Sequence, residues 1–307
     1  MIRALDLFCG CGGLSLGFQY AGIDVVRAFD HWDKAINIYN KNFSHKAELI
    51  DIYDLIPEYL ESFSPNIIIG GPPCQDYSSA GKRDESQGRA NLTLRYAELV
   101  CLVKPEWFVM ENVDRILKSK TLPKALSLFK ATGYGLSQVI LDASRCGVPQ
   151  KRKRFFLIGH INDTDNFLTA SLYADLSSKS TTIREYLGNE FQIEYYYRHP
   201  RSYARRGIFS IDEPSPTIRG VNRPIPPGYS IHAGDATKDL SKVRPLTTLE
   251  RARIQTFPKS FEFSGNKTDL EQMIGNAVPV DLAKYVAQHL KDYIENYTSI
   301  PRQLQFF

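Results

Sequence analysis

Two side chains stand where covalent and acid-base chemistry could be carried out, Cys74 and Glu111. Cys74 follows Gly-Gly-Pro-Pro at residues 70–73, and the two prolines fix φ and hold the loop that presents the thiol. Most cysteines are buried and inert, but a thiol on a rigid loop after an apolar run is placed as a nucleophile. Glu111 follows a second apolar run, Trp107–Met110, so its carboxyl group is expected at the same edge of a sheet.

A basic segment, Gln-Lys-Arg-Lys-Arg at residues 150–154, leads into another apolar run. Alternate residues of a strand share a face, so Gln150, Arg152 and Arg154 are expected to point the same way. A bare run of charge is most often a solvated surface. The alternation, together with the position in the chain, favours a binding face.

Residues after the first three predicted strands indicate a ligand that contains adenosine. The glycine turn at residues 10–13 lies between a strand and a helix, where glycine allows close backbone approach to a ligand. Its spacing is not that of the Gly-x-Gly-x-x-Gly dinucleotide fingerprint. Asp30 could accept hydrogen bonds from ribose hydroxyls. Trp32 could stack on adenine or lie in the core, and Asp51–Ile52 could meet the exocyclic amine of a purine.

Short apolar runs alternate with stretches of helical periodicity through the first half of the chain. The predicted strands are Ala4–Phe8, Val25–Phe29, Asn66–Gly70, Trp107–Met110, Val139–Leu141 and Phe155–Ile158, with another before Asp51. The predicted helices are Lys34–Asn42, Leu92–Val103, Pro123–Ala131 and Val280–Tyr293. Near-continuous apolar strands suit a mostly parallel sheet covered on both faces. We therefore predict a doubly wound α/β fold, which binds ligands at the carboxyl ends of its strands.

Positive charge is concentrated in a loop-rich segment, residues 195–229. The 307 residues include 38 Lys and Arg against 34 Asp and Glu, a formal charge of +4. Residues 195–229 hold six arginines, no lysine and two acids, so this segment alone sums to +4. The arginines are Arg198, Arg201, Arg205, Arg206, Arg219 and Arg223. Arginine can bond guanine bidentately and can also grip phosphate, so the segment is predicted to recognise nucleic acid.

Composition and spacing exclude several other classes of protein. The 12% of aromatic residues is too much core-forming material for a disordered chain, and no run of about 18 apolar residues could span a membrane. An acid at Asp6 stands where a secretory signal needs an apolar run, and five sparse cysteines do not form a disulfide scaffold. A cytoplasmic protein is therefore expected. Cys9 and Cys11 have no nearby Cys or His partners, so zinc is only an alternative and no metal is expected.

The motifs, taken in order, resemble those of the DNA (cytosine-5)-methyltransferases. Residues 6–13 (Asp-Leu-Phe-Cys-Gly-Cys-Gly-Gly) are similar to the family's cofactor motif, and Pro73–Gln75 are similar to its catalytic motif. Glu111–Val113 match its ENV motif, and residues 150–154 match its QxRxR motif. Residues 244–258 resemble its late motif, and Gly275–Pro279 resemble its closing GNxVP element. Each motif alone is weak. Six in the family's order, along nearly the whole chain, are specific.

The resemblance implies transfer of a methyl group from S-adenosylmethionine to carbon 5 of cytosine. In that chemistry the Cys74 thiolate adds to ring carbon 6, carbon 5 attacks the methyl group, and loss of the carbon 5 proton with elimination of Cys74 ends the turnover. Glu111 is expected to bond ring nitrogen 3 and the exocyclic amine, with a raised pKa. Arg154 would contact the cytosine carbonyl, with Gln150 and Arg152 in support. The target base would be flipped out of the duplex.

The resemblance also assigns a set of cofactor-binding residues. They are Phe8, Gly10, Gly12, Gly13, Asp30, Trp32, Asp51, Ile52, Pro72, Leu92, Asn276 and Ala277. Many relatives have serine at the position of Ala277, so only a backbone role carries over there. Residues 78–95 are expected to form a mobile loop that closes over DNA. Its predicted DNA contacts are Ser78, Lys82, Arg83 and Arg89.

The domains expected from the resemblance are a catalytic and cofactor-binding domain at 1–175, a target-recognition domain at 176–272, and a returning C-terminal segment at 273–307. This layout favours a prokaryotic, monomeric enzyme that modifies a short sequence of double-stranded DNA and is paired with a restriction endonuclease. One alternative is a tRNA cytosine-5 methyltransferase of the same family, which the arginine-rich segment disfavours. Another is a DNA-binding member without activity, which the presence of Cys74, Glu111 and Arg154 disfavours.

Overall fold

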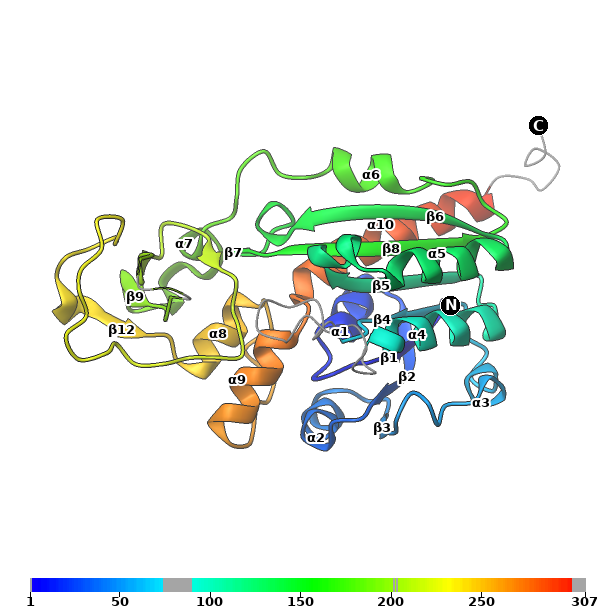
Figure 1. Ribbon diagram of the computed structural model, residues 1–307, viewed down its shortest axis with the longest axis horizontal. Coiled ribbons are helices and arrows are strands. Elements are labelled where there is room, and N and C mark those ends of the chain that lie inside the picture. Colours follow the sequence, from blue (N-terminus) through cyan, green and yellow to red (C-terminus); the bar gives the residue numbers. More distant parts are fainter. Residues whose placement is uncertain (1, 74–89, 201, 203, 300–307) are drawn as a thin grey trace. The chain divides into compact units, whose positions relative to one another are not determined.

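The computed structural model describes residues 2–73, 90–200, 202 and 204–299 (Figure 1). The chain divides into two compact units. Unit 1 consists of Met1–Leu141, Lys153–Leu176 and Ala283–Phe307, and unit 2 of Asp142–Arg152 and Ser177–Leu282. Each unit has an apolar cluster of its own.

Unit 1 is built on a seven-stranded sheet, in the order β3-β2-β1-β4-β5-β8-β6 within the described residues. The strands are β1 (Arg3–Leu7), β2 (Asp24–Asp30), β3 (Ala47–Leu49), β4 (Ile67–Gly70), β5 (Trp107–Val113), β6 (Tyr134–Asp142) and β8 (Lys153–Ile161). The first five pair in parallel, and β8 runs antiparallel to β5. The predicted doubly wound, mostly parallel α/β sheet is confirmed.

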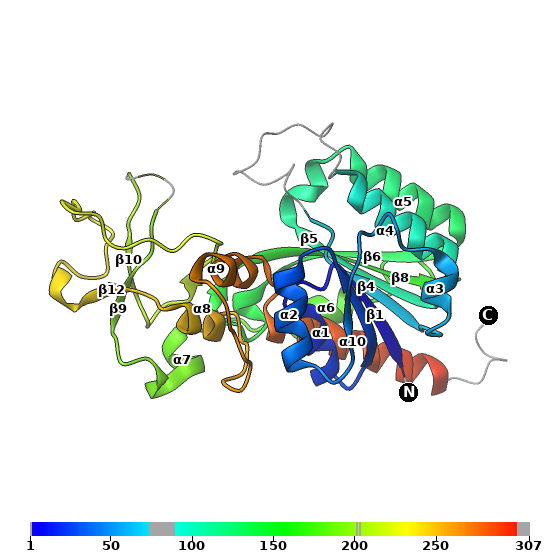
Figure 2. The ribbon, with the colours of Figure 1, turned by 90° about the horizontal axis from the view of Figure 1, so that it is seen from below.

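Helices cover both faces of this sheet. They are α1 (Gly13–Tyr20), α2 (Asp33–Asn42), α3 (Pro57–Glu61), α4 (Ala90–Val103), α5 (Thr121–Thr132), α6 (Thr169–Ala174) and α10 (Val280–Ser299), with a short 3-10 helix at Asp114–Lys118. Figure 2 shows α4 and α5 on one face, and α1 and α10 on the other. All four residues of β4 are buried, which explains why the strand reads as a continuous apolar run rather than an alternating one.

Two predicted elements have different limits in the structure from those that the sequence predicts. β6 begins at Tyr134 rather than Val139, and it includes Gly135, which usually weakens a strand. A β-carbon at Gly135 would lie 2.4 Å from the Asp163 carbonyl oxygen, so glycine is required there for close packing. The expected loop at residues 78–95 is also wrong at its end, because α4 already begins at Ala90.

Unit 2 contains short elements joined by long loops, as the loop-rich segment predicts. Its strands are β7 (Gln150–Lys151), β9 (Tyr195–Tyr197), β10 (Ile208–Ser210), β11 (Ser215–Pro216) and β12 (Val243–Pro245). Its helices are α7 (Ile183–Leu187), α8 (Thr248–Ile254) and α9 (Lys267–Asn276), with 3-10 turns at Ala143–Arg145, Gly188–Glu190 and Leu240–Lys242. β9 lies between β10 and β12, and β11 pairs with β7.

The compact units do not have the same limits as the predicted functional domains. Asp142–Arg152 and residues 273–282 belong to unit 2, although the sequence reading assigned them to the first and last domains. The functional boundaries remain a prediction. No helix of the described residues is long and apolar enough to cross a membrane.

Candidate active site

The turn between β1 and α1 brings the glycine motif to the carboxyl edge of the sheet. Phe8 follows β1 with a φ of 69°, a left-handed conformation that is unfavourable for a residue other than glycine. Its amide donates to the carbonyl of Phe29 at 2.9 Å. Gly12 has a φ of 97°, and a β-carbon there would lie 2.4 Å from the ring of Phe43. Both its conformation and its surroundings therefore require glycine.

The carboxylate of Asp30 joins the ends of β1 and β2. One oxygen accepts a hydrogen bond from the amide of Gly10 at 2.8 Å, and the other accepts from the amide of Trp32 at 2.9 Å. Each carboxylate oxygen can accept more than one hydrogen bond. Asp30 is thus held in place by two backbone donors and can still accept hydrogen bonds from a ligand.

A cavity of about 350 Å³ lies at the ends of the first three strands of unit 1. Its lining residues are Phe8, Phe29, Asp30, His31, Ile50, Asp51, Ile52, Tyr53, Leu55 and Leu92. The walls are mostly apolar and carry two carboxyl groups, and the volume is within the range of small-molecule sites. A flat purine and a hydroxylated sugar suit this combination, so the residues present fit an adenosine-containing cofactor.

Five of the predicted cofactor residues line this cavity: Phe8, Asp30, Asp51, Ile52 and Leu92. Gly10, Gly12 and Gly13 form the adjoining turn, and Pro72 follows the end of β4. His31, for which the sequence alone gives no role, lines the cavity, whereas Trp32 precedes α2 and is not among the lining residues. The role of Trp32 beside adenine remains a prediction. Asn276 and Ala277 belong to unit 2.

Arg95 of α4 holds the loop that carries Asp51 and Ile52. Its Nε donates to the carbonyl of Ile52 at 3.3 Å, and its Nη2 donates to the carbonyl of Leu55 at 2.7 Å. The carboxylate of Asp51 also accepts a hydrogen bond from the amide of Tyr53 at 2.9 Å. Arg95 is therefore part of a helix that supports the cavity, and the assignment of this residue to a mobile loop is wrong.

A second cluster joins β5 and β8. The strands are antiparallel, with Glu111 opposite Phe156 and Val113 opposite Arg154, so Glu111 and Arg154 are diagonal neighbours on one face. Nε of Arg154 lies 2.8 Å from Oε1 of Glu111, and the two side chains are only 13% and 11% exposed. The nearby cation favours the charged carboxylate, whereas burial opposes it. The expected rise in the pKa of Glu111 remains a prediction.

Asn112 connects this pair to the loop that follows β4. Its Nδ2 donates to the carbonyl of Pro72 at 3.2 Å, and its Oδ1 accepts from the amide of Val113 at 2.9 Å. A β-carbon at Gly71 would lie 3.2 Å from Oε2 of Glu111, so this glycine leaves room for the carboxylate. The sequence alone gives Asn112 no role, although its position inside the ENV motif is the available signal.

Several predicted residues lie outside the described ranges. They are Cys74, Ser78, Lys82, Arg83, Arg89 and Arg201. The structure therefore defines the residues that precede the catalytic loop, as far as residue 73, and their roles beyond that point remain predictions.

The predicted common face of residues 150–154 is not formed by one strand. β7 ends at Lys151 and β8 begins at Lys153, so Arg152 interrupts the strand. Gln150 and Arg152 are fully buried, and they belong to unit 2, whereas Arg154 belongs to unit 1. The expectation of a binding face is wrong for Gln150 and Arg152, because both side chains are buried and bonded to other segments of unit 2. A direction shared with Arg154 remains a prediction.

Both buried residues brace other segments of unit 2. Gln150 accepts from the amide of Ile218 at 2.8 Å and donates to Oε1 of Gln255 at 2.7 Å. Arg152 donates to three carbonyls at 3.0 Å, those of Ile218, Gly275 and Ala277. Their contacts support a positioning role, consistent with the supporting function expected for them.

The arginines that the structure describes in residues 195–229 fall into two groups. Arg206 pairs with Glu213 and lies 4.2 Å from the ring centroid of Phe209. The guanidinium groups of Arg198 and Arg219 donate to backbone carbonyls. The other group consists of Arg205 and Arg223, whose side chains are exposed. Composition alone treated these residues as equivalent, and their different contacts separate them.

A buried hydrogen-bonded chain lies beside the glycine turn. Ser15 donates to the carboxyl group of Asp6 at 2.5 Å, Tyr39 donates to Ser15 at 2.8 Å, and the Tyr39 hydroxyl lies 2.6 Å from Nε2 of His45. Burial raises the pKa of Asp6 to about 8 and lowers that of His45 to about 4. Both ends of the chain are therefore neutral near pH 7.

The glycine turn also carries two cysteines, and the expectation that no metal binds there remains a prediction. Cys9 and Cys11 are buried, and burial raises the pKa of the Cys11 thiol to about 12, which disfavours the thiolate that zinc binds. Within the described ranges, no three His, Cys, Asp or Glu side chains are grouped so that they could hold a metal ion.

Comparisons with known proteins agree on one family. Residues 2–292 match the family described as C-5 cytosine-specific DNA methylase. The chain is 60% identical over 295 residues to type II methyltransferase M.HindV of Haemophilus influenzae, covering 95% of this chain and 97% of the relative. It is 54% identical over 295 residues to type II methyltransferase M.HgiDI of Herpetosiphon aurantiacus, covering 95% of each.

Solved structures show the same fold at lower identity. S. pombe Dnmt2 methyltransferase aligns with a TM-score of 0.74 and 21% identity, over 97% of this chain and 99% of that one. A putative DNA modification methyltransferase encoded within an E. coli prophage aligns with a TM-score of 0.72 and 22% identity, over 96% and 100%. At these identities the likeness supports the fold alone.

A doubly wound sheet with such a cavity at its carboxyl edge is the architecture of an α/β enzyme that binds a nucleoside-containing cofactor. The family match is more specific, because it spans nearly the whole chain: the protein belongs to the C-5 cytosine-specific DNA methylase family. The resemblance is confirmed. The chain is a DNA (cytosine-5)-methyltransferase, and its cofactor is S-adenosylmethionine.

Proposed function

We propose that the protein methylates cytosine within one short sequence of double-stranded DNA through a covalent Cys74 adduct. The observation that carries this proposal is the Glu111–Arg154 pair, which stands next to the residues leading to Cys74. An acid and a cation held on one face match a base with a ring nitrogen, an exocyclic amine and a carbonyl oxygen. A cytosine reaches such a site only when it is flipped out of the duplex.

In the proposed mechanism, the Cys74 thiolate forms a bond to ring carbon 6, and the electrons of the carbon 5–carbon 6 double bond become available at carbon 5. Glu111 bonds ring nitrogen 3 and the exocyclic amine, and so stabilises the charge that develops on the ring. Arg154 donates to the carbonyl oxygen. After methyl transfer, carbon 5 loses its proton and the bond between carbon 6 and sulfur breaks, which restores the ring and the thiolate.

S-adenosylmethionine supplies the methyl group. We propose that Asp30 accepts hydrogen bonds from its ribose, that Asp51 and Ile52 meet the adenine edge, and that Phe8 and Leu92 provide apolar walls. The two amides bound to Asp30 keep its carboxylate oriented, so little side-chain ordering is needed when the cofactor binds. Asn276 and Ala277 are proposed to close over the methionine part.

We further propose that the enzyme protects the DNA of its host from a restriction endonuclease that recognises the same sequence. The identity of 60% to a type II methyltransferase, across nearly the full length of both chains, supports this pairing. We propose that the enzyme acts as a monomer, which light scattering tests by a solution mass near 34.9 kDa.

Bisulfite sequencing after expression in a host that lacks cytosine methylation tests the proposed function. We expect unconverted cytosines in one short sequence, and resistance of that DNA to an endonuclease that cuts the sequence. Conversion of every genomic cytosine would contradict the proposal. Sequencing tRNA from the same cells tests the alternative substrate, since methylated tRNA beside unmodified DNA would favour it.

A further inference from the structure

The first half of the segment at residues 217–222 is fixed by β7. Oγ1 of Thr217 donates to the carbonyl of Lys151 at 2.8 Å, and the amide of Ile218 donates to the side chain of Gln150 at 2.8 Å. Because Gln150 is fully buried, the hydrogen bond to Ile218 lies in the interior of unit 2, whereas the bond from Thr217 is exposed. The segment therefore leaves β11 in a defined direction.

The second half is fixed by a buried ion pair. Arg251 and Glu271 pair with each other, and each side chain is only 4% exposed. Arg251 also donates to the carbonyl of Arg219, and Glu271 accepts from Nδ2 of Asn222 at 3.0 Å. The segment is therefore tied through Arg251 to α8 and through Glu271 to α9.

Close backbone packing restricts the same segment from α9. A β-carbon at Gly275 would lie 2.3 Å from the amide nitrogen of Gly220, and one at Gly220 would lie 2.1 Å from Oε1 of Gln272. The contact at Gly275 is with backbone and leaves no room for a side chain, whereas the exposed side chain of Gln272 could move away from one at Gly220. The path from Thr217 to Asn222 is thus determined from both sides.

This path turns two arginines toward the protein backbone. Nη2 of Arg198 donates to the carbonyl of Thr217 at 2.9 Å, and Nη2 of Arg219 donates to the carbonyl of His199 at 2.5 Å. The two side chains thereby connect residues 198–199 to residues 217–219. Both are partly buried, and these hydrogen bonds orient their guanidinium groups.

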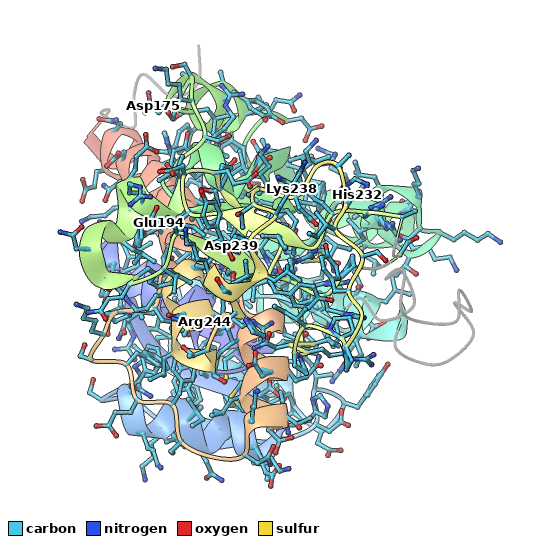
Figure 3. The ribbon with its side chains drawn as sticks, turned by 90° about the vertical axis from the view of Figure 1, so that its left-hand side faces the viewer. Asp175, Glu194, His232, Lys238, Asp239 and Arg244 are labelled. Carbon is cyan, nitrogen blue, oxygen red and sulfur yellow. The ribbon has the colours of Figure 1, made fainter. Side chains whose placement is uncertain are left out.

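Arg223 follows the fixed segment and is exposed. The hydrogen bond from Arg219 to the carbonyl of His199 holds these two residues together. Burial lowers the pKa of His199, and the charges of Arg223, Arg219 and Arg198 lower it further. The view of unit 2 in Figure 3 shows side chains of both signs, among them Glu194, Asp239, Lys238 and Arg244. Like charges held together repel, and an anionic partner relieves that repulsion.

We propose that the buried scaffold presents Arg223 to DNA, and that Arg219 is a positioning residue. The inference rests on the proposed function and deepens it, because it separates two arginines that the sequence treats alike. The acceptor that Arg223 bonds is an oxygen or nitrogen of DNA, on either a phosphate or the edge of a guanine. These two sources differ in salt dependence and in sequence preference.

Measuring DNA binding at several salt concentrations tests the proposal with two duplexes. One duplex contains the sequence mapped by bisulfite sequencing, and the other contains that sequence scrambled. Arg223→Ala should weaken binding to the mapped duplex by roughly tenfold or more. For a phosphate contact, the slope of log K against log salt falls by about 0.9 and both duplexes are affected. For a guanine contact, the slope is kept and the preference between duplexes shrinks. Lys238→Ala removes one exposed charge as the matched control.

Equal binding by Arg223→Ala and Lys238→Ala, at every salt concentration, would overturn the assignment of Arg223. Arg219→Ala should lower the midpoint of thermal unfolding, because the tie to His199 is lost, whereas Arg223→Ala should not. An unchanged midpoint for Arg219→Ala, with a salt slope reduced by about one, would make Arg219 the contact instead. If the unaltered enzyme methylates its site and these patterns are absent, only this inference fails. If it methylates nothing, the proposed function fails.

Discussion

Nε of Arg154 lies 2.8 Å from Oε1 of Glu111, across the antiparallel pairing of β5 with β8. The antiparallel direction matters, because the carboxyl end of β5 meets the beginning of β8. Glu111, at the end of one apolar run, and Arg154, just before another, are thereby brought together. The two residues are far apart in the sequence, so no local pattern shows that they are neighbours. The register of β5 with β8 places them together.

Glu111→Gln should lower kcat by roughly 10²- to 10⁴-fold, because an amide cannot supply the same proton or charge to the ring. Binding of S-adenosylmethionine should change little, since Glu111 is not among the cavity lining residues. Single-turnover methylation measures the first effect and calorimetry the second. Glu106→Gln, which changes an exposed acid just before β5, is the matched control. Equal rates for the two variants would remove Glu111 from the mechanism.

Asp30→Ala should weaken S-adenosylmethionine binding by about tenfold to a hundredfold, which corresponds to loss of a charged hydrogen bond of roughly 1.5–3 kcal/mol. The amides of Gly10 and Trp32 also lose their shared acceptor, so the turn should loosen. Calorimetric titration with the cofactor measures the affinity. Asp33→Ala, at an exposed position beside the same turn, is the control. An affinity unchanged by Asp30→Ala would exclude the ribose contact.

Asp6 should make the folded protein less stable as the pH rises toward 8. Its pKa is about 8 in the folded state against an ordinary value of 3.8, so the folded state holds more protons between these values and loses stability as the pH rises. The pKa of His45, lowered to about 4 from 6.5, gives the opposite slope, but only below pH 6.5. The Asp6 effect is therefore uncompensated between about pH 6.5 and 8.

Asp6→Asn keeps a neutral group of the same shape and should remove this slope. Urea unfolding at pH 6.5 and pH 8.5 measures this slope. Between these two pH values, the free energy of unfolding should fall more for the unaltered protein than for the variant. Parallel behaviour of the two proteins would show that Asp6 does not titrate in this range.

Arg152→Met should lower the free energy of unfolding by about 3 kcal/mol or more, because three carbonyls, two of them in buried hydrogen bonds, lose their donor. Arg145→Met removes an exposed arginine that donates to one carbonyl at 2.7 Å, and should cost less than about 1 kcal/mol. Denaturant titration compares the two. A loss of activity in Arg152→Met without any loss of stability would indicate direct contact with substrate instead.

Much of the fold could be predicted because its central strands are buried on both faces. β4 and β5 appear as apolar runs for that reason, and residues after a run are naturally suspected of function. Asp30, Asp51 and Glu111 were found in this way. β6 was underestimated, since its glycine is required by a distant backbone rather than by local preference.

The parts that could not be predicted depend on contacts between distant segments. The roles of Gln150 and Arg152 follow from hydrogen bonds to residues 218, 255, 275 and 277, which no local pattern reveals. The same applies to the arginines: Arg219 and Arg223 are four positions apart, but a carbonyl at His199 engages only the first. Composition gives the total charge of the segment, but it does not show which arginine side chains bond the protein and which are exposed.

Trapping of the enzyme on DNA tests the central claim most directly. In a duplex whose target cytosine carries fluorine at carbon 5, there is no proton to lose after methyl transfer, so the bond between carbon 6 and sulfur should persist. Denaturing electrophoresis should show a covalent complex that requires S-adenosylmethionine, absent with Cys74→Ala and present with Cys146→Ala. Two results would contradict covalent catalysis by Cys74. One is the absence of the complex with the unaltered enzyme, although that enzyme methylates the normal duplex. The other is equal trapping by Cys74→Ala.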